Sequence, residues 1–305
     1  MSILVTGGAG FIGSNLLHYL EQFGEEVICV DKLSYAADET NLPDYVKFYR
    51  TDIADEESVR DVFRNESITK IFHLAAESHV DNSIKDCKPF IHSNIIGTVN
   101  LLQCALEYEV SRFMHISTDE VFGSIAYGSF NEISRYRPRN PYSASKASSD
   151  HFVNAYHTTY GLPTIITNCS NNYGPRQYHE KMVPKTILSL MNDRPVDVYG
   201  NGLQIRDWIY VDDHCKALVE LSNRGRVGQS YNVGGECELK NIELVRMIAK
   251  LMKKEPDINF VKDRLGHDQR YSTSNDKITT ETPWTVSTHI EEGLLKTIKY
   301  YYEQN

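Results

Sequence analysis

Positive charge is in short supply in this chain of 305 residues. Lys and Arg number 32 against 41 Asp and Glu, which gives a formal net charge of -9. Because nucleic acids are bound by basic faces, this balance argues against nucleic acid as the main partner. A few local cations and helix N-termini can still bind a phosphorylated metabolite.

Long hydrophobic runs are also missing. No apolar run reaches the roughly 18 residues that a membrane-spanning helix needs. The N-terminus has no charged and then apolar signal pattern, because Ile3 to Val5 reads directly as a strand. We therefore expect no membrane partner and a cytoplasmic location.

Cysteine is sparse, and the cysteines show no paired spacing. A zinc site would need close pairs of Cys or His, and none occurs, so we expect no metal. The apolar surroundings of most of them predict buried free thiols, which favours a reducing compartment. The six cysteines are Cys29, Cys87, Cys104, Cys169, Cys215 and Cys237.

What the chain does contain is a regular alternation of short apolar runs and helical patterns over its first half. Such alternation predicts an α/β fold with a doubly wound parallel sheet. We expect a sheet domain over 1–170 and, over 171–305, mainly a smaller mixed lobe with some segments returning to the sheet. The predicted strands are Ser2–Val5, Val27–Val30, Val46–Tyr49, Ile71–Leu74, Phe113–Ile116 and Thr164–Thr167.

A glycine-rich run follows the first predicted strand, with glycines at Gly7, Gly10 and Gly13. Glycine permits a tight turn and a close approach of backbone to a pyrophosphate, and the next helix directs its N-terminal dipole at that group. The second strand ends in Asp31, which suits an adenosine ribose and repels a 2′-phosphate. This favours NAD over NADP, although Lys32 follows; the alternative is that Asp31 is a turn residue.

A hydroxyl and two carboxylates follow the fifth predicted strand, as Thr118, Asp119 and Glu120. Ligands of open α/β sheets bind beyond the carboxyl ends of the strands, so chemistry is expected there. Two carboxyl groups in different surroundings can keep different pKa values and act as an acid and a base. The alternative is that this stretch only caps the next helix.

Tyr142 and Lys146 lie four residues apart at the start of a predicted helix and therefore share one face. A nearby ammonium, together with a positively charged nicotinamide, would lower the pKa of the phenol from about 10. The phenolate could then take a proton from a sugar hydroxyl. The alternative is an ordinary pair on the helix surface.

Beyond the sixth strand the chain turns polar, and we place the second lobe there. Tyr199 lies in a predicted turn over 197–202, where a nucleotide base could stack, unless it is a surface tyrosine. Arg206 suits a bidentate phosphate contact, unless it pairs with Asp207 or Asp212. Residues 263–268 form a charged loop that could close over a substrate.

Taken together, these motifs resemble the extended short-chain dehydrogenase/reductases and, within them, the dTDP-glucose 4,6-dehydratases. The resemblance implies a Rossmann-type fold, tightly bound NAD, and a homodimer formed through the helices near 95–107 and 143–160. The matching stretches are Thr6–Asn15, His73–Asp81, Ser117–Gly123, Pro141–Asp150, Asn168–Pro175, Gln204–His214 and Asp263–Tyr271.

The resemblance also assigns roles. Tyr142 is the redox base with Lys146 beside it, Thr118 binds the 4-hydroxyl, Asp119 protonates the leaving 6-hydroxyl, and Glu120 removes the C5 proton. The implied cofactor-binding residues are Gly7, Gly10, Phe11, Ile12, Gly13, Asp31, Lys32, Ser34, Asp52, Ile53, Leu74, Ala75, Ala76, Ser78, Ser93, Tyr142, Lys146 and Asn172. The implied substrate-binding residues are Ser78, Thr118, Asn171, Lys181, Met182, Tyr199, Arg206, Asn241, Arg264 and His267.

The chain departs from the family pattern at a few places. The segment 35–46 is shorter, and Ser93, Phe122, His179 and Asp197 replace the usual residues. Asp197 falls near the implied base pocket, so thymidine and uridine nucleotides both stay open. A nucleotide-sugar 4-epimerase and a non-catalytic NAD-binding protein are the competing interpretations. The pair Asp119–Glu120 argues against the first, and the presence of both Tyr142 and Lys146 against the second.

Overall fold

A computed structural model describes residues 2–304 and contains a central sheet of seven parallel strands in the order β10-β6-β5-β4-β1-β2-β3. The chain builds outward from β1 to β3 and then crosses to β4 on the other side, so the strand order reverses at β1 and β4. This confirms the doubly wound parallel sheet, and it places a ligand crevice at that reversal. The strands are β1 (Ser2–Thr6), β2 (Glu26–Asp31), β3 (Lys47–Arg50), β4 (Ile68–His73), β5 (Arg112–Thr118), β6 (Thr164–Cys169) and β10 (Gln229–Val233).

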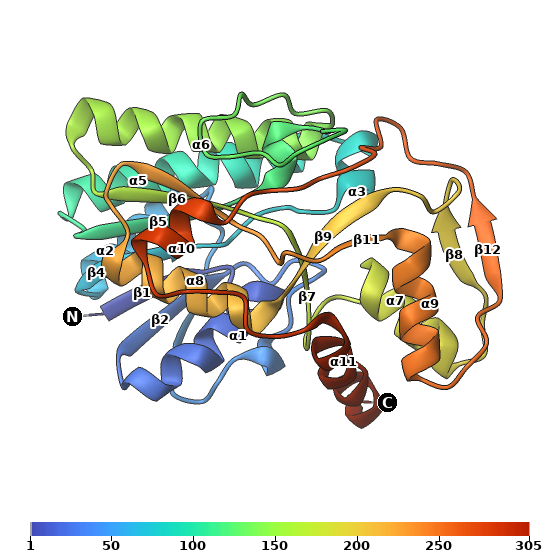
Figure 1. The fold of residues 1–305 in the computed structure, drawn as a ribbon. Helices are drawn as coiled ribbons and strands as arrows, with labels where there is room; N and C mark the ends of the chain where they lie inside the picture. The colour runs from blue at the N-terminus through green and yellow to red at the C-terminus, as the bar shows by residue number, and fades with distance from the viewer. Residues whose placement is uncertain (1, 305) are drawn as a thin grey trace.

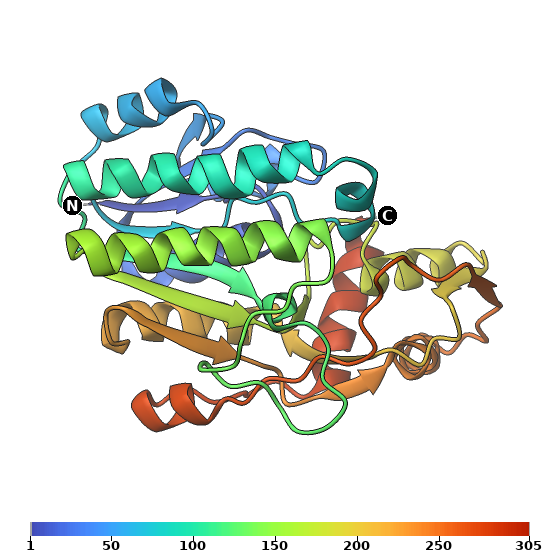
Figure 2. The same ribbon diagram turned by 90° about the horizontal axis from the view of Figure 1, so that it is seen from above.

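Helices cover both faces of this sheet. On one face α2 (Glu56–Asn65), α5 (Gly97–Glu107) and α6 (Pro141–Tyr160) lie side by side (Figure 2). On the other face α1 (Phe11–Leu20) packs against α8 (Val211–Arg224), while α10 (Asp276–Glu281) lies against β10. Because both faces are covered, strands such as β1 are buried at every position, as parallel strands require.

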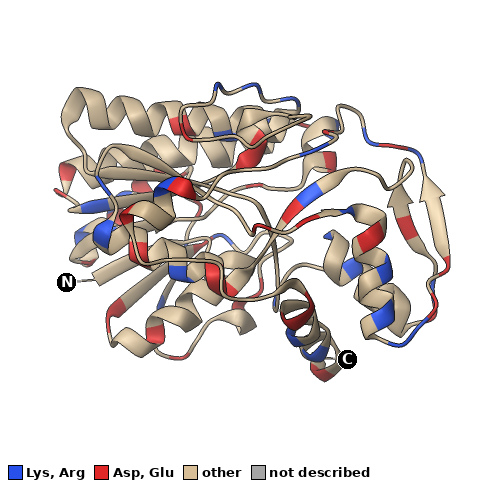
Figure 3. Ribbon diagram, in the orientation of Figure 1, with Lys and Arg blue, Asp and Glu red and all other residues tan. Residues whose placement is uncertain are grey.

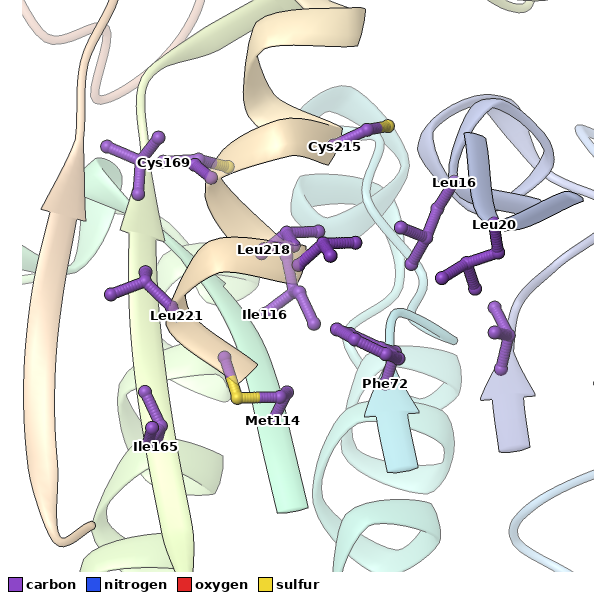
Figure 4. Packing of buried hydrophobic residues seen from close by; sticks show 14 of the residues in the cluster. Leu16, Leu20, Phe72, Met114, Ile116, Ile165, Cys169, Cys215, Leu218 and Leu221 are labelled. Atoms are coloured by element: carbon purple, nitrogen blue, oxygen red, sulfur yellow. The ribbon is translucent and has the colours of Figure 1, made fainter. Parts of the chain in front are cut away.

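Figure 4 shows the core between the sheet, α1 and α8. Leu16 and Leu20 of α1 meet Leu218 of α8 above Phe72 of β4, and each is nearly or fully buried. Burying one such side chain contributes about 1.5–3 kcal/mol, so this cluster fixes α1, and with it the glycine loop, on the sheet. A second cluster, on the opposite face, joins β4 and β5 to α2 and α5.

The second lobe lies beyond the carboxyl edge of the sheet, to the right in Figure 1. It has a mixed sheet of β7 (Asn171–Tyr173), β9 (Ile205–Tyr210) and β11 (Glu238–Lys240), and a pair of parallel strands, β8 (Val196–Tyr199) and β12 (Ile258–Val261). A third apolar cluster joins α7 (Met182–Met191), α9 (Asn241–Leu251) and α11 (Ile290–Gln304). This is the smaller mixed lobe that the sequence predicts.

Segments of the second half return to the sheet, since β10 pairs with β6, α8 packs on α1 and α10 lies against β10. The division into 1–170 and 171–305 itself stays a prediction. Lys and Arg are interspersed with Asp and Glu over both lobes (Figure 3). Of the helices described within residues 2–304, none has the length and apolar character needed to cross a bilayer.

Local structure corrects two expectations. The predicted turn over 197–202 begins as a strand, because β8 pairs with β12 through Tyr199 and the chain turns only at Gly200 and Gly202. The helix expected from Ile95 instead begins at α4 (Lys88–Phe90) and passes through a π-helix, η3 (Ile91–Ile96), before α5. The remaining short elements are η1 (Glu21–Phe23), η2 (Glu39–Asn41), α3 (Val80–Lys85) and η4 (Asp119–Phe122).

Candidate active site

The glycine loop joins β1 to α1, and its glycines are required by close backbone contacts. A Cβ on Gly13 would lie 2.1 Å from the carbonyl oxygen of Gly7, and one on Gly7 would lie 2.7 Å from the amide nitrogen of Ala75. Gly7 also has a φ of +73°, in the left-handed region that favours glycine. The loop therefore brings the N-terminus of α1 against the ends of β1 and β4.

A cleft of about 310 Å³ opens at this point, along the carboxyl ends of the central strands. Every residue implied as cofactor-binding lines this cleft, and so do the five residues implied as catalytic. Four of the implied substrate-binding residues line it as well: Ser78, Thr118, Asn171 and Lys181. One continuous cleft thus joins the glycine loop to Tyr142 and to the carboxyl pair.

Asp31 and Lys32 occupy the far end of the cleft. The two carboxylate oxygens of Asp31 accept hydrogen bonds from the amides of Ala9 at 3.1 Å and Leu33 at 2.8 Å. The Lys32 ammonium lies 3.3 Å from Glu77 and 3.7 Å from Asp52, and it donates to the Ser93 hydroxyl at 2.8 Å. Its charge is therefore already matched by two carboxylates, which weakens any attraction for a 2′-phosphate.

Lys146 is buried, so the pair with Tyr142 does not lie on the outer surface of the helix. Its ammonium donates to the Ile116 carbonyl oxygen of β5 at 2.8 Å. Burial lowers the pKa of Lys146, while Asp150 raises it. The lysine is thereby fixed between α6 and the sheet, one helical turn from Tyr142.

The expected lowering of the Tyr142 pKa does not come from the protein's own groups. Burial raises the pKa of Tyr142 well above its usual value, and Glu120 raises it further; a hydrogen bond with Thr118 acts in the opposite direction. Any phenolate at neutral pH must therefore rely on a further positive charge brought close to the ring.

Thr118 ends β5, and its hydroxyl accepts a hydrogen bond from the Glu120 amide at 3.2 Å. The stretch therefore does cap a helix, the short η4, but it also lines the cleft. Asp119 is buried, and its Oδ2 has no hydrogen-bond partner within residues 2–304. Burial, followed by the neighbouring Glu120, raises the pKa of Asp119 well above its usual range.

Glu120 has different surroundings. Burial raises its pKa too, but a hydrogen bond from Asn140 and the positive charge of Arg206 lower it. Because the charge on Glu120 itself discourages ionisation of Asp119, the arrangement favours a protonated Asp119 beside an ionised Glu120. The two carboxyl groups can thus serve as an acid and a base.

Buried polar groups hold this end of β5 in place. The Ser117 hydroxyl donates to Asp150 at 2.8 Å, and the His115 ring lies 3.1 Å from the same carboxylate. Burial lowers the pKa of His115 to about 4, so this histidine is neutral. His73 is likewise internal, bonded to the hydroxyls of Thr6 and Thr98. Within residues 2–304, no group of three or more His, Cys, Asp or Glu could hold a metal ion.

Three of the remaining implied substrate-binding residues do not line the cleft and instead gather around Tyr199. Arg264 makes a bidentate ion pair with Asp81 of α3, at 2.6 and 2.9 Å, and lies over the ring of Tyr199. The Tyr199 hydroxyl donates to the same carboxylate at 3.1 Å. His267 contacts Asp263 in the same loop, 2.6 Å away. The charged loop thus already bridges the two lobes.

The other implied substrate-binding residues make different contacts. Arg206 is buried over the Tyr271 ring and donates to the carbonyl oxygens of Ile205 and Asp268, rather than pairing with Asp207. Met182 packs against the apolar cluster of the second lobe. Asn241 begins α9, and its buried Oδ1 lacks a partner within residues 2–304, so it is able to accept a hydrogen bond.

Sequence reasoning missed several residues that shape the cleft. Asn94, in the π-helix, bonds the backbone of Glu77 in both directions and donates to the Ser145 hydroxyl at 2.8 Å. Asn140 holds Glu120, and Asp81 holds Arg264. A π-helix is itself frequent at functional sites, yet the local sequence showed only an ordinary helical pattern.

The residues present fit a dinucleotide. The glycine contacts leave room for a pyrophosphate at the N-terminus of α1, which carries partial positive charge. Asp31 and Asp52 stand where ribose hydroxyls could donate to them, and the small residues Ala75 and Ala76 line the cleft between the loop and Tyr142. A nicotinamide lying there would also bring the positive charge that the Tyr142 phenol lacks.

Comparison with known proteins gives consistent results. A "probable dTDP-glucose 4,6-dehydratase" of Sinorhizobium fredii and the "dTDP-glucose 4,6-dehydratase" of Haemophilus influenzae are each 45% identical, over 99% of this chain and 93% and 98% of their own lengths. Among solved structures, a dTDP-glucose 4,6-dehydratase from Streptomyces venezuelae with NAD bound has a TM-score of 0.96 and 40% identity, covering 99% of this chain and 97% of that one.

A Thermus thermophilus UDP-glucose 4-epimerase in complex with NAD has almost the same fold, with a TM-score of 0.95, but only 30% identity, over 99% of each chain. The family model described as "GDP-mannose 4,6 dehydratase" matches residues 4–297. With that match over nearly its whole length, the chain belongs to the GDP-mannose 4,6 dehydratase family.

Proposed function

We propose that this protein is an NAD-dependent hydro-lyase that converts dTDP-glucose to its 4-keto-6-deoxy product. The observation that carries the proposal is the carboxyl pair Asp119–Glu120, which lines the same cleft as Tyr142 and Lys146. Relatives 45% identical over 99% of this chain bear the name of this activity, which supports it.

The difficulty of the reaction explains why two kinds of chemistry share one cleft. The C5 proton of glucose is too weakly acidic to be removed directly, so water cannot simply leave across C5 and C6. Once C4 is a ketone, C5 lies next to a carbonyl group that stabilises the carbanion. NAD, when bound, supplies the hydride acceptor at C4 and later the hydride donor at C6.

The residues of this chain perform the proton transfers. Tyr142 takes the proton of the 4-hydroxyl, with Lys146 and Thr118 holding phenol and hydroxyl in place. Glu120 then removes the C5 proton, and Asp119 gives its proton to the departing 6-hydroxyl, which leaves as water. Hydride addition at C6 is balanced by return of the proton from Glu120 to C5.

The cycle closes when the proton held by Tyr142 replaces the one lost from Asp119. Both residues line the same cleft, which supports this exchange. The raised pKa of Asp119 suits its role, because an acid must hold its proton at neutral pH. Overall one water is lost, and the nicotinamide is regenerated in place.

An epimerase would use the same oxidation at C4 but needs no adjacent acid and base. The higher identity to dehydratases, 40–45% against 30% for the epimerase, agrees with the carboxyl pair. A non-catalytic NAD-binding protein would have no use for a buried Lys146 beside Tyr142 or for the buried carboxyl group of Asp119.

We propose thymidine rather than uridine as the nucleotide on the strength of the relatives' names, with the dTDP-rhamnose pathway as one destination. Asp197, the unusual residue near the implied base pocket, pairs with Lys185 at 3.0 Å and accepts from Asn259 at 2.9 Å. Its charge is thereby matched by Lys185 of α7 and bonded to Asn259 of β12. This leaves Tyr199 as the aromatic surface for the base.

We further propose a homodimer formed through the helices near 95–107 and 143–160, which are α5, with η3 before it, and α6. Large apolar side chains are exposed on these neighbouring helices, which a monomer would leave in water. They are Ile91, Ile96, Phe152 and Tyr160, each more than 40% exposed. Sedimentation showing only monomer at micromolar concentration would contradict the homodimer.

The free cysteines accord with a reducing compartment, and we propose the cytoplasm.

The test of the activity is product mass. The purified protein is incubated separately with dTDP-glucose and UDP-glucose, and the nucleotide sugars are weighed by mass spectrometry. We expect dTDP-glucose to lose one water. An unchanged mass with a new stereochemistry would indicate an epimerase instead, and preferential dehydration of UDP-glucose would contradict the choice of nucleotide.

A further inference from the structure

Asn140 is a buried residue whose amide makes two contacts in opposite directions. Its Oδ1 accepts a hydrogen bond from the Ser143 amide at 2.8 Å and so caps the N-terminus of α6. Its Nδ2 donates to the Oε2 atom of Glu120 at 3.2 Å. The backbone N–H of Asn140 in turn donates to the Ser143 hydroxyl at 3.3 Å, which completes a capping box.

These contacts fix which way the amide faces. The Ser143 N–H needs an acceptor, and only the carbonyl oxygen of the side chain can serve, so the NH₂ group must face Glu120. One planar group therefore joins the short helix carrying Glu120 to the helix carrying Tyr142 and Lys146. A change in the position of α6 would move the support of Glu120 with it.

The charges around Glu120 come from several elements. Arg206 of β9, Arg264 of the charged loop 263–268 and Lys181 at the start of α7 favour the ionised form of Glu120. Asp119 and Asp268 oppose it. The phenols of Tyr142 and Tyr271 also face it. Among the groups that favour the carboxylate, Asn140 has the largest effect and donates a hydrogen bond directly to it.

We propose that Asn140 is a positioning residue that keeps Glu120 ionised and aimed at the substrate while it caps the helix that carries Tyr142. The inference rests on the proposed dehydratase function, in which Glu120 is the base. It predicts that the two roles of Asn140 can be separated, because other side chains can cap a helix without donating to Glu120.

Two variants make the separation. Asn140→Asp keeps an acceptor for the Ser143 amide, but it replaces the donor by a second carboxylate facing Glu120. Asn140→Ser keeps the cap with a hydroxyl too short to span the contact with Glu120. Asn131→Asp is the matched control, because it adds the same charge to an exposed residue of the preceding loop.

Two steps are followed for each protein. The first oxidation is read from the burst of reduced nicotinamide on mixing with dTDP-glucose, and the elimination from the dehydrated product, both across a pH series. A wild-type protein that dehydrates dTDP-glucose establishes the proposed function before any variant is compared. A wild-type protein that does not dehydrate dTDP-glucose would contradict the proposed function, whereas variants that depart from the expected pattern would contradict only the role of Asn140.

We expect Asn140→Asp to keep the oxidation burst and the melting temperature. The rate of elimination at pH 7 should fall about tenfold, and the acid limb of its pH–rate profile should move up by about one pH unit. Asn140→Ser should shift the limb in the same direction by less, and Asn131→Asp should match wild type. An unmoved acid limb in Asn140→Asp would overturn the proposal. So would an equal loss of burst and elimination with a lower melting temperature, since that marks a structural role alone.

Discussion

The ammonium of Lys146 lies 2.8 Å from the carbonyl oxygen of Ile116, so the lysine is bonded to the sheet. This contact fixes the charge between β5 and α6, close to where Tyr142 enters the cleft. The protein's own groups raise the pKa of Tyr142, and we therefore propose that the lysine adds its charge to the positive charge of a bound cofactor.

Replacing Lys146 by Met should remove this help. We expect the first oxidation to slow by about a hundredfold at neutral pH and to recover in part at higher pH, where the phenol ionises unaided. The burst of reduced nicotinamide measures it. Lys299→Met, a change on the exposed side of α11, is the control and should match wild type. A variant with a normal burst at pH 7 would remove Lys146 from the redox step.

Variants of the two carboxyl groups should both block the elimination, but with different signs. Glu120→Gln keeps the oxidation but cannot accept the C5 proton, so reduced nicotinamide should accumulate without product. Asp119→Asn leaves the base intact, and deuterium from solvent should enter C5 while loss of water is slow. Rapid quenching and mass spectrometry distinguish them. Turnover of Glu120→Gln at the wild-type rate would disprove its assignment as the base.

Asp119 also predicts a dependence of stability on pH. Its pKa is raised in the folded protein, so the folded state binds a proton more tightly than the unfolded state does. The stability that this proton contributes is lost as the pH rises through the folded pKa. Asp119→Asn cannot ionise, and we expect its melting temperature to exceed that of wild type by a few degrees above neutral pH. Below pH 3.8, the ordinary pKa of Asp, the side chain is neutral in both the folded and the unfolded wild type, so the difference should vanish. A constant difference across the series would mean that ionisation of Asp119 is not the cause.

The choice of cofactor should depend on Asp31. Asp31→Asn removes the charge that repels a 2′-phosphate and weakens the bonds to ribose hydroxyls, so we expect the preference for NAD over NADP to fall about tenfold. The ratio of the two dissociation constants is the quantity to compare, since Asp31 also accepts two backbone hydrogen bonds. Asp38→Asn, at the exposed N-cap of η2, should leave the ratio unchanged.

Much of this architecture could be predicted from local patterns. Gly7, Gly10 and Gly13 lie between a strand and a helix, and the contact that requires Gly13 is with Gly7, within the same loop. The carboxyl pair follows directly from β5, since the end of a buried strand shows in the sequence. These features depend on short-range geometry, which a sequence records.

The contacts that aim the side chains could not be predicted in the same way. Asp81 and Arg264 are 183 residues apart, and Glu120 and Asn140 are 20 apart across an irregular loop. Neither pair has a characteristic spacing, because the fold brings them together through two different lobes or helices. The electrostatics of Tyr142 likewise depend on burial and on Glu120, which the spacing of Tyr142 and Lys146 does not contain.

The central claim is that a hydride leaves C4 and returns to C6 of the same sugar. The most direct measurement mixes dTDP-glucose carrying deuterium at C4 with dTDP-glucose that has no deuterium but carries heavy carbon throughout, and locates the deuterium in the product. We predict that deuterium appears at C6 only in molecules without heavy carbon. Deuterium lost to solvent, or shared with the heavy-carbon product, would contradict the account.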